Sequence, residues 1–504
     1  MSKVLVVIID GMDRLQVARF EKELPALRQL KEQGSQLTSS SVCPPDSPTA
    51  CASLYTGLNP ARHGVVYFID PLEKTGFLAT EEADNSTIRG RTFWDLAGQS
   101  GKRVCVLLPY LGYPVWPVNG IMVGKSTITT NVQILPESSA TEYPLPALTS
   151  VKGFPGHGAR LDRYIEAHKR LVSRELELAR QMWAKESWDL FAVYSGCLDT
   201  IHHYFWKYSD EEDPSYPGPN RYHDVLRDFY KLYDAFIGEL MALAGADTSV
   251  LVASDHGHGR RPVKLLNVNE LLRQKGLLAS RARAGAGGGS LLLAERLKRS
   301  ALSFVSKHDL GNLARLLLKV FPGAKRLYTS PPAIDWDRTL AYVSDLSGIK
   351  AYSHGGIKIA RQNLAGRDYE ELRDSVIEDI SGIVEPASGQ KLVKWIRRRE
   401  DLYSGEYINR YPDIILELEE DWGVGWAVHN SLFGASASHN LVPGSHKSQS
   451  PVLFVRDARG RTVGQREATL MDIAPTVLDL LQVEVKADFD GRSLFQKGRP
   501  DRGD

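Results

Sequence analysis

The strongest constraint on the fold is a set of short runs of Val, Ile and Leu that are apolar throughout and do not alternate with polar residues. Strands buried on both faces of a parallel sheet need this pattern, because helices cover both sides of the sheet. Segments with apolar residues at three- and four-residue spacing, such as 161–185 and 222–243, lie between the runs and are typical of amphipathic helices. This alternation predicts an α/β fold with a doubly wound, mostly parallel sheet. The apolar runs are residues 4–9, 104–108, 190–194, 250–253, 414–418 and 452–455.

The chain has 504 residues, which is more than one hydrophobic core usually spans. A string rich in Gly, Ala and Arg up to residue 290 is typical of a linker, and helical patterns follow it. Residues 110–160 are rich in Pro, Gly, Ser and Thr, and we expect them to form a long loop near the functional edge of the sheet. The expected boundaries are 1–270 and 335–496 for the core, 271–334 for a helical cap or insertion, and 497–504 for a flexible tail.

Charge and hydropathy exclude several classes of protein. The 62 basic and 61 acidic residues leave a formal charge of +1, so the chain lacks the overall basic character of a protein that forms a stable nucleic-acid complex. The first apolar run stops at Asp10, and no later stretch is long enough to span a membrane or serve as a secretion signal. Four cysteines without C-x-x-C spacing indicate neither a disulfide framework nor a zinc ribbon. We therefore expect a cytoplasmic protein, and the sequence leaves its oligomeric state open.

Acidic residues follow three of the apolar runs. Asp10 ends the first run, Asp199 follows the third, and Asp255 with His256 ends the fourth. In a parallel sheet, ligands bind beyond the carboxyl ends of the strands, so these side chains are expected to meet at one edge. Because three neighbouring carboxylates repel one another unless cations lie among them, the sequence indicates a metal site.

Histidines near two of these carboxylates have spacings that suit metal ligation. Asp199 and His203 are four residues apart, so one helical turn brings them to the same face, whereas His202 points away. Glycines after His256 let the backbone bend closely around an ion. The alternative interpretations are a surface ion pair for the first motif and a simple tight turn for the second.

A hydroxyl nucleophile is expected in the segment 45–53, which holds Ser47 and Thr49. A serine hydroxyl is a weak nucleophile at neutral pH unless a base or a metal lowers its pKa. No G-x-S-x-G motif surrounds Ser47, and the chain contains no G-x-x-x-x-G-K-[ST] motif. These absences exclude an α/β-hydrolase elbow and a P-loop.

Taken in order, the motifs resemble the type I phosphodiesterase/nucleotide pyrophosphatase branch of the alkaline phosphatase superfamily. They are V-I-I-D-G-M-D from residue 7, a hydroxyl nucleophile ahead of T-G-L-x-P-x-x-H-G, then D-x-x-x-H, S-D-H-G and a late G-x-H. The resemblance implies an alkaline phosphatase-like core and a hydrolase that cleaves phosphate esters of phosphodiester or nucleotide pyrophosphate type. It also implies two divalent metal ions, usually zinc, with manganese as the alternative, and a small phosphorylated substrate.

The resemblance also implies a role for each site residue. Ser47 matches the nucleophile, nine residues before Thr56, with Thr49 as the alternative. His258 would lie behind the ligands rather than among them. Asp46 stands where relatives have a basic residue, and Phe68 stands where they have an asparagine that contacts the phosphoryl group. One ion would be held by Asp10, Ser47, Asp255 and His256, and the other by Asp199, His203 and a late histidine that is either His446 or His439.

Several alternatives within and outside the superfamily stay open at this point. A sulfatase needs C-x-P-x-R, and the segment from Cys43 to Ser47 has serine in place of the arginine. A phosphomonoesterase, a phosphonate hydrolase or a phosphomutase would keep the same ligands. A non-catalytic relative that binds a phosphorylated or glycan ligand is the alternative from a different class.

Overall fold

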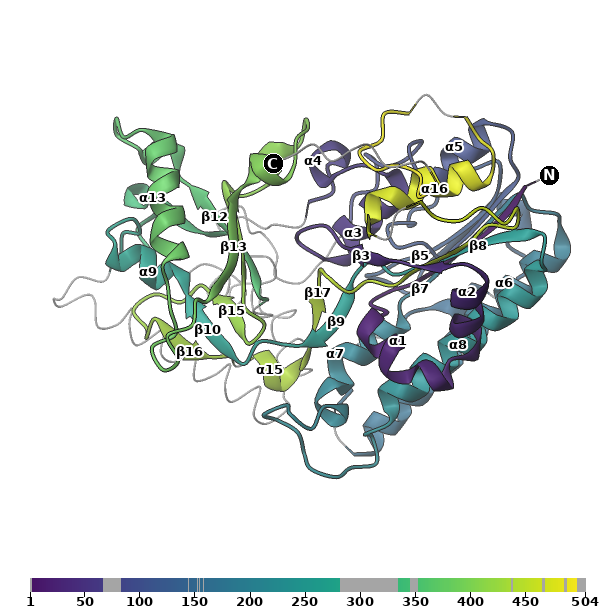
Figure 1. Ribbon diagram of the computed structural model, residues 1–504, viewed down its shortest axis with the longest axis horizontal. Helices are drawn as coiled ribbons and strands as arrows, with labels where there is room; N and C mark the ends of the chain where they lie inside the picture. The colour runs from purple at the N-terminus through teal and green to yellow at the C-terminus, as the bar shows by residue number, and fades with distance from the viewer. Residues whose placement is uncertain are drawn as a thin grey trace.

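The computed structural model describes most of the chain (Figure 1). Most of the expected cap, the C-terminal tail and Phe68 lie outside the described residues. None of the described helices is both long and apolar enough to cross a membrane. The described residues are 2–66, 83–143, 145–151, 153, 155–156, 158–281, 334–344, 352–436, 438–464, 467–484 and 487–495.

A central eight-stranded sheet confirms the predicted α/β fold with a mostly parallel sheet. The strands β8, β1, β7, β4 and β5 are parallel neighbours, and antiparallel strands complete the sheet at both edges. In spatial order the sheet comprises β2 (Ser35–Gln36), β18 (Leu453–Arg456), β8 (Thr248–Ala253), β1 (Lys3–Ile9), β7 (Leu190–Ser195), β4 (Val104–Leu107), β5 (Gly120–Lys125) and β6 (Val132–Leu135).

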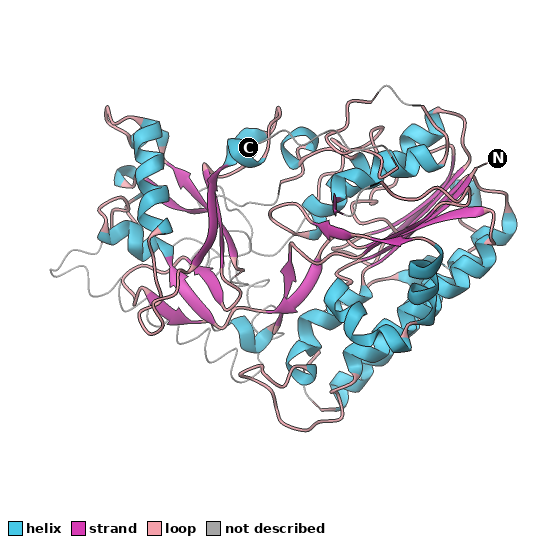
Figure 2. Cartoon of the chain, in the orientation of Figure 1, coloured by secondary structure: helices cyan, strands magenta, loops and turns pink. Residues whose placement is uncertain are grey.

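Helices cover both faces of this sheet, which explains why its strands are continuously apolar (Figures 1 and 2). Along β1, Val4, Val6 and Ile8 belong to one hydrophobic cluster, and the residues between them belong to the other. Each such side chain contributes about 1.5–3 kcal/mol when it is fully buried. One face packs against α3 (Ser47–Thr56), α5 (Phe93–Gln99) and α16 (Ile473–Leu480), and the other against α2 (Pro25–Gln33), α6 (Ala159–Lys185), α7 (Cys197–Ser209) and α8 (Val225–Ala244).

A second unit lies beside the central sheet and has its own hydrophobic cluster. It contains a four-stranded antiparallel sheet and a three-stranded mixed sheet. The strands are β11 (Ala341–Ser344), β12 (His354–Ile359), β14 (Ile414–Leu418) and β13 (Val393–Arg398) in the first sheet, and β15 (Trp422–Gly425), β10 (Lys264–Asn267) and β16 (Phe433–Ala435) in the second. Helices α9 (Val268–Gln274) and α13 (Tyr369–Ser381) pack against them.

The assignment of run 414–418 to the parallel sheet was wrong, because these residues form β14 in the antiparallel sheet of the second unit. Ile414, Leu416 and Leu418 face the cluster of that unit, while Ile415 packs on Cys43 at its other face. The strand is therefore buried on both sides and has the composition of a parallel strand. Run 452–455 does join the central sheet, as β18, but antiparallel to β8.

The expectation of one long loop over residues 110–160 also needs correction, because β5 and β6 lie within it. Gly120 and Gly124 interrupt the apolar pattern of β5, and each approaches another strand or loop too closely for a side chain. A Cβ on Gly120 would lie 1.9 Å from the carbonyl oxygen of Val104 in β4. The backbones approach so closely at these two positions that only glycine fits. Strand β5 therefore lacks the apolar side chains that would have marked it as a strand in the sequence.

A two-stranded antiparallel ribbon lies between the central sheet and the second unit (Figure 1). It pairs β9 (Gly257–Arg260), which follows β8, with β17 (Gly444–Lys447), which comes after the whole second unit in sequence. The ribbon places His446 directly opposite His258. This pairing brings a late segment of the chain to the edge where β1, β7 and β8 end.

Candidate metal and catalytic site

Three adjacent strands deliver carboxylates to one edge of the central sheet, as the sequence predicted for parallel strands. Strand β1 lies between β7 and β8, and Asp10 and Asp255 follow the ends of β1 and β8. Asp199 lies in the first turn of α7, just after β7. The turn at Gly11 has a φ of +67°, and a Cβ there would lie 3.1 Å from the Cβ of Asp199. Glycine is therefore required where Asp10 and Asp199 come together.

The first cluster of candidate metal ligands is the Asp255 group, which consists of Asp10, Asp255 and His256. His256 Nε2 lies 3.3 Å from Asp10 Oδ1 and 3.5 Å from Asp255 Oδ2. Its other nitrogen, Nδ1, lies 3.1 Å from the carbonyl oxygen of Gly257, to which it can donate. The lone pair of Nε2 then faces two carboxylate oxygens, an arrangement that a cation between them would stabilise.

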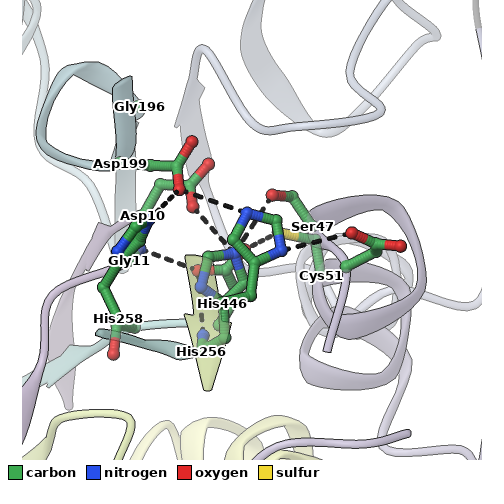
Figure 3. Close-up of polar contacts among 12 residues, drawn as sticks. Asp10, Gly11, Ser47, Cys51, Gly196, Asp199, His256, His258 and His446 are labelled. Carbon is green, nitrogen blue, oxygen red and sulfur yellow. Dashed lines mark hydrogen bonds and ion pairs between the residues drawn. The ribbon is translucent and has the colours of Figure 1, made fainter. Parts of the chain in front are cut away.

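The second cluster is the Asp199 group, which consists of Asp199, His203, His258 and His446. Asp199 Oδ1 lies 3.4 Å from the Nε2 atom of each of the three histidines. The Nε2 atoms of His203 and His446 are 3.0 Å apart. The His446 ring also stacks on His256 with ring centroids 3.9 Å apart, so the two groups are direct neighbours (Figure 3).

The spacing of these donor atoms fits a tetrahedral metal ion. Nitrogen and oxygen ligands with bonds of about 2.0–2.1 Å to a tetrahedral centre are about 3.3–3.4 Å from one another. The distances from Asp199 Oδ1 and from His256 Nε2 to their partners range from 3.3 to 3.5 Å, and the distance between the Nε2 atoms of His203 and His446 is 3.0 Å. The residues present therefore fit a metal ion in each group.

Unpaired buried atoms provide a second test of this fit. Within the described part of the chain, Asp10 Oδ1, Asp199 Oδ1 and both ring nitrogens of His258 are buried without a hydrogen bond of ordinary geometry. Leaving such polar atoms buried and unpaired is costly, and a cation in each group would satisfy Asp10 Oδ1, Asp199 Oδ1 and His258 Nε2.

The electrostatics of the two groups differ because their neighbours differ. Burial raises the pKa of Asp10 well above its ordinary value, and the charges of Asp255 and Asp199 raise it further. Burial also acts to raise the pKa of Asp199, but His203, with the other imidazoles, outweighs it and holds that pKa well below its usual range. Burial lowers the pKa of His258 well below its ordinary value. Asp10 therefore needs an added positive charge nearby to stay ionised.

Ser47 begins helix α3 and lies beside the Asp255 group. Its Oγ is 3.3 Å from His256 Nε2, and the residue lines a cavity of about 340 Å³ that also contains Asp10, Asp199 and His446. The N-terminus of a helix favours negative charge next to Ser47 Oγ. Thr49 is fully buried within the same helix and does not line this cavity.

The structure separates the two candidate late histidines. His446 lies in the Asp199 group, whereas His439 Nε2 lies 2.8 Å from Asp213 Oδ1 and its Nδ1 lies 3.0 Å from the carbonyl oxygen of Arg261. His258, which the sequence analysis placed behind the ligands, is grouped with them instead.

The walls of the cavity include residues that the sequence analysis did not single out. The Tyr194 hydroxyl donates to Asp10 Oδ2. Tyr194 lies near the carboxyl end of β7, so the argument from strand ends that identified Asp10 would also have identified Tyr194. Lys125, at the end of β5, faces the cavity, and its Nζ lies 2.7 Å from Glu175 Oε1 behind it. Glu175 is fully buried and its Oε2 accepts a hydrogen bond from Ser195. The sequence analysis could not single out Lys125, because it did not predict the strand that carries this residue.

Comparison with solved structures identifies the fold. Two structures of phosphonoacetate hydrolase from Sinorhizobium meliloti 1021, in complex with phosphonoformate and with phosphonoacetate, match with TM-scores of 0.54 and 0.53. Both are 16% identical to this chain, and each match covers 96% of this chain and 95% of the other. A search of curated proteins found no match.

Together with a family match, this fold defines a hydrolase of the alkaline phosphatase superfamily that acts on phosphoric ester bonds. A family model described as type I phosphodiesterase / nucleotide pyrophosphatase matches residues 4–431, and the chain belongs to that family. The family match ends before His446. The assignment of this residue to the site therefore depends on the pairing of β17 with β9 and not on the family match. The family is typically metal-dependent, in agreement with the two candidate ligand groups.

Proposed function

We propose that this chain hydrolyses small phosphorylated substrates with a phosphodiester or nucleotide pyrophosphate bond, through a phosphoseryl intermediate at Ser47. The observation that carries the proposal is the placement of Ser47 Oγ 3.3 Å from His256 Nε2, beside two ligand groups with tetrahedral spacing. Imidazole and carboxylate donors in this geometry favour Zn²⁺, with Mn²⁺ as the alternative.

The two ligand groups divide the work of holding the ions. The Asp255 group and Ser47 Oγ would hold one ion, and Asp199, His203 and His446 the other, with His258 as a further donor. When bound, the two cations would lower the pKa of the Ser47 hydroxyl and stabilise negative charge on the phosphoryl oxygens.

The residues of the chain orient and carry out the transfer. Ser47 Oγ forms a bond to phosphorus as the bond to the leaving oxygen breaks, and the serine proton ends on the product alcohol or phosphate. Water then adds its hydroxyl to phosphorus and returns a proton to Ser47 Oγ. His256 is held with Nε2 toward Ser47 because its Nδ1 donates to the Gly257 carbonyl oxygen.

Paired substitutions in α3 test this assignment. We expect Ser47→Ala to lose at least about 10³-fold in kcat, while bound metal falls far less, because the covalent step disappears. Thr49→Val is the matched control, since it removes a hydroxyl from the same helix outside the cavity. Acid quenching during turnover followed by peptide mass spectrometry should find phosphoserine at Ser47. Equal rates for wild type and Ser47→Ala, or loss of activity in Thr49→Val alone, would refute the assignment.

A substrate panel tests the bond that is cleaved. It spans nucleotide, glycerophospho and phosphonate substrates, each with Zn²⁺ and with Mn²⁺, and includes phosphonoacetate because the solved neighbours bind it. We expect the highest kcat/KM for a phosphodiester or pyrophosphate bond. A metal-loaded wild-type protein that binds these compounds but cleaves none would be a binding protein and not a hydrolase.

A further inference from the structure

A carboxylate lies against the nitrogen of His446 that faces away from the Asp199 group. Asp46 Oδ1 is 3.2 Å from His446 Nδ1, and Asp46 is buried at the edge of the cavity. Asp46 occupies the N-cap position of α3, where an aspartate usually accepts from the N–H groups of the first turn. Its side chain makes no such hydrogen bond. The carboxylate is therefore directed toward His446 and not toward its own helix.

The two nitrogens of the His446 ring have different surroundings. Nε2 lies 3.4 Å from Asp199 Oδ1 and 3.0 Å from His203 Nε2, where a cation would be bound. Nε2 can offer its lone pair to a cation only when the ring proton is on Nδ1. Among the residues that the structure describes, His446 Nδ1 makes no hydrogen bond of ordinary geometry, and Asp46 Oδ1 is the carboxylate oxygen at ion-pair distance from it. A negative charge beside Nδ1 favours a proton on that nitrogen, which is the tautomer that metal binding needs.

Two other histidines of the site show the same arrangement with a weaker acceptor. His203 Nδ1 lies 3.1 Å from the carbonyl oxygen of Gly444, and His256 Nδ1 lies 3.1 Å from that of Gly257. Each carbonyl orients its ring without adding a charge. Asp46 differs because its carboxylate also makes Nε2, the other nitrogen of the His446 ring, a stronger electron-pair donor to a metal ion.

We propose that Asp46 is a positioning residue for the metal ion of the Asp199 group, acting through His446. The inference rests on the proposed function, because it requires that this group bind a metal. It assigns a role to the acidic residue that stands beside the proposed nucleophile. It also means that one contact joins the start of α3, which carries Ser47, to strand β17.

Metal titration of the chelator-stripped protein tests this role without using activity. Zn²⁺ affinity is measured by chelator competition, and Co²⁺ absorption reports the ligand geometry. We expect Asp46→Asn, which keeps an acceptor but loses the charge, to weaken one of the two sites about 10-fold, and Asp46→Ala up to about 100-fold. The matched control is Asp213→Asn, which removes the carboxylate from the buried pair with His439 outside the site and should leave both affinities unchanged.

The outcomes separate the two proposals. If the wild-type protein binds neither Zn²⁺ nor Mn²⁺, the proposed function fails and this inference fails with it. If wild type binds two ions and Asp46→Asn binds both as tightly, only the role of Asp46 is refuted. A lower thermal unfolding midpoint with unchanged affinity in Asp46→Asn would likewise assign a purely structural role.

Discussion

Replacing Lys125 by methionine would leave a carboxylate buried without its cation. Lys125 Nζ lies 2.7 Å from Glu175 Oε1, and Glu175 is fully buried. Breaking such a pair from one side costs about 3–5 kcal/mol. A carboxyl group can escape this cost by taking up a proton, which for a glutamate with a solution pKa of about 4.3 costs about 4 kcal/mol at pH 7 and about 1 kcal/mol at pH 5. We expect Lys125→Met to lower the free energy of unfolding by about 3–4 kcal/mol at pH 7 and by about 1 kcal/mol at pH 5.

The sign of this pH dependence follows from which state binds the proton. In the variant the folded carboxyl holds its proton more tightly than the unfolded one, so the penalty is absent below pH 4 and grows as the pH rises. Burial lowers the pKa of Lys125 in the wild type, but Glu175 more than offsets this, and the net pKa is raised above 10.5. Lys125 therefore stays charged throughout the range from pH 5 to pH 7, and only its absence in the variant matters.

Urea unfolding followed by tryptophan fluorescence at pH 5 and pH 7 measures the effect. The controls are Glu175→Gln and the double variant Lys125→Met/Glu175→Gln, which should be more stable than either single variant because it leaves no buried charge unpaired. Destabilisation of Lys125→Met that is equal at the two pH values would refute the reasoning. So would a double variant whose loss is the sum of the two single losses.

Two further predictions concern the histidines. His446→Ala should release one of the two bound ions in metal analysis, while His439→Ala should keep both ions and lower the thermal unfolding midpoint, because it breaks the contact with Asp213; the reverse result would exchange the two roles. Burial lowers the pKa of His63 to about 3 and that of His168 to about 4, below the ordinary 6.5. The unfolded chain therefore binds more protons below pH 6.5, so the stability these groups provide is present above that pH and is lost as the pH falls, by up to about 1.4 kcal/mol per pH unit for each group. Urea midpoints that stay constant from pH 7 to pH 5 would contradict this.

The carboxylate side of the site was predictable because it depends on a local rule. Asp10 and Asp255 each end a continuous apolar run, and adjacent parallel strands bring such residues to one edge. The four-residue spacing of Asp199 and His203 on α7 likewise needs no knowledge of distant contacts. Strands β1, β4, β7 and β8 and helices α6 and α8 were found for the same reason, since each is marked by its own pattern of apolar residues.

The late histidine could not be chosen from the sequence, because the choice depends on long-range pairing. His439 and His446 lie in one segment without a clear period, and each has a plausible spacing. Strand β17 pairs with β9 so that His446 lies opposite His258, and no local pattern encodes this register. The same pairing explains why His258 joins the Asp199 group.

The assignment of run 414–418 to the parallel sheet was wrong for a different reason. Strand β14 is covered on both faces, so its apolar run is identical in kind to that of a parallel strand. Composition reports how completely a strand is buried but not the direction of its neighbours.

The ribbon of β9 and β17 gives the site an order of assembly during synthesis. His203 and His446 are 243 residues apart, and the whole second unit is made between them. At 5–20 residues per second, translation of the 191 residues from Asp255 to His446 takes roughly 10–40 s, during which Asp10, Asp199 and Asp255 already exist without their last imidazole partner. A nascent chain of this protein therefore presents these three carboxylates to cellular cations well before the complete set of candidate metal ligands has been synthesised.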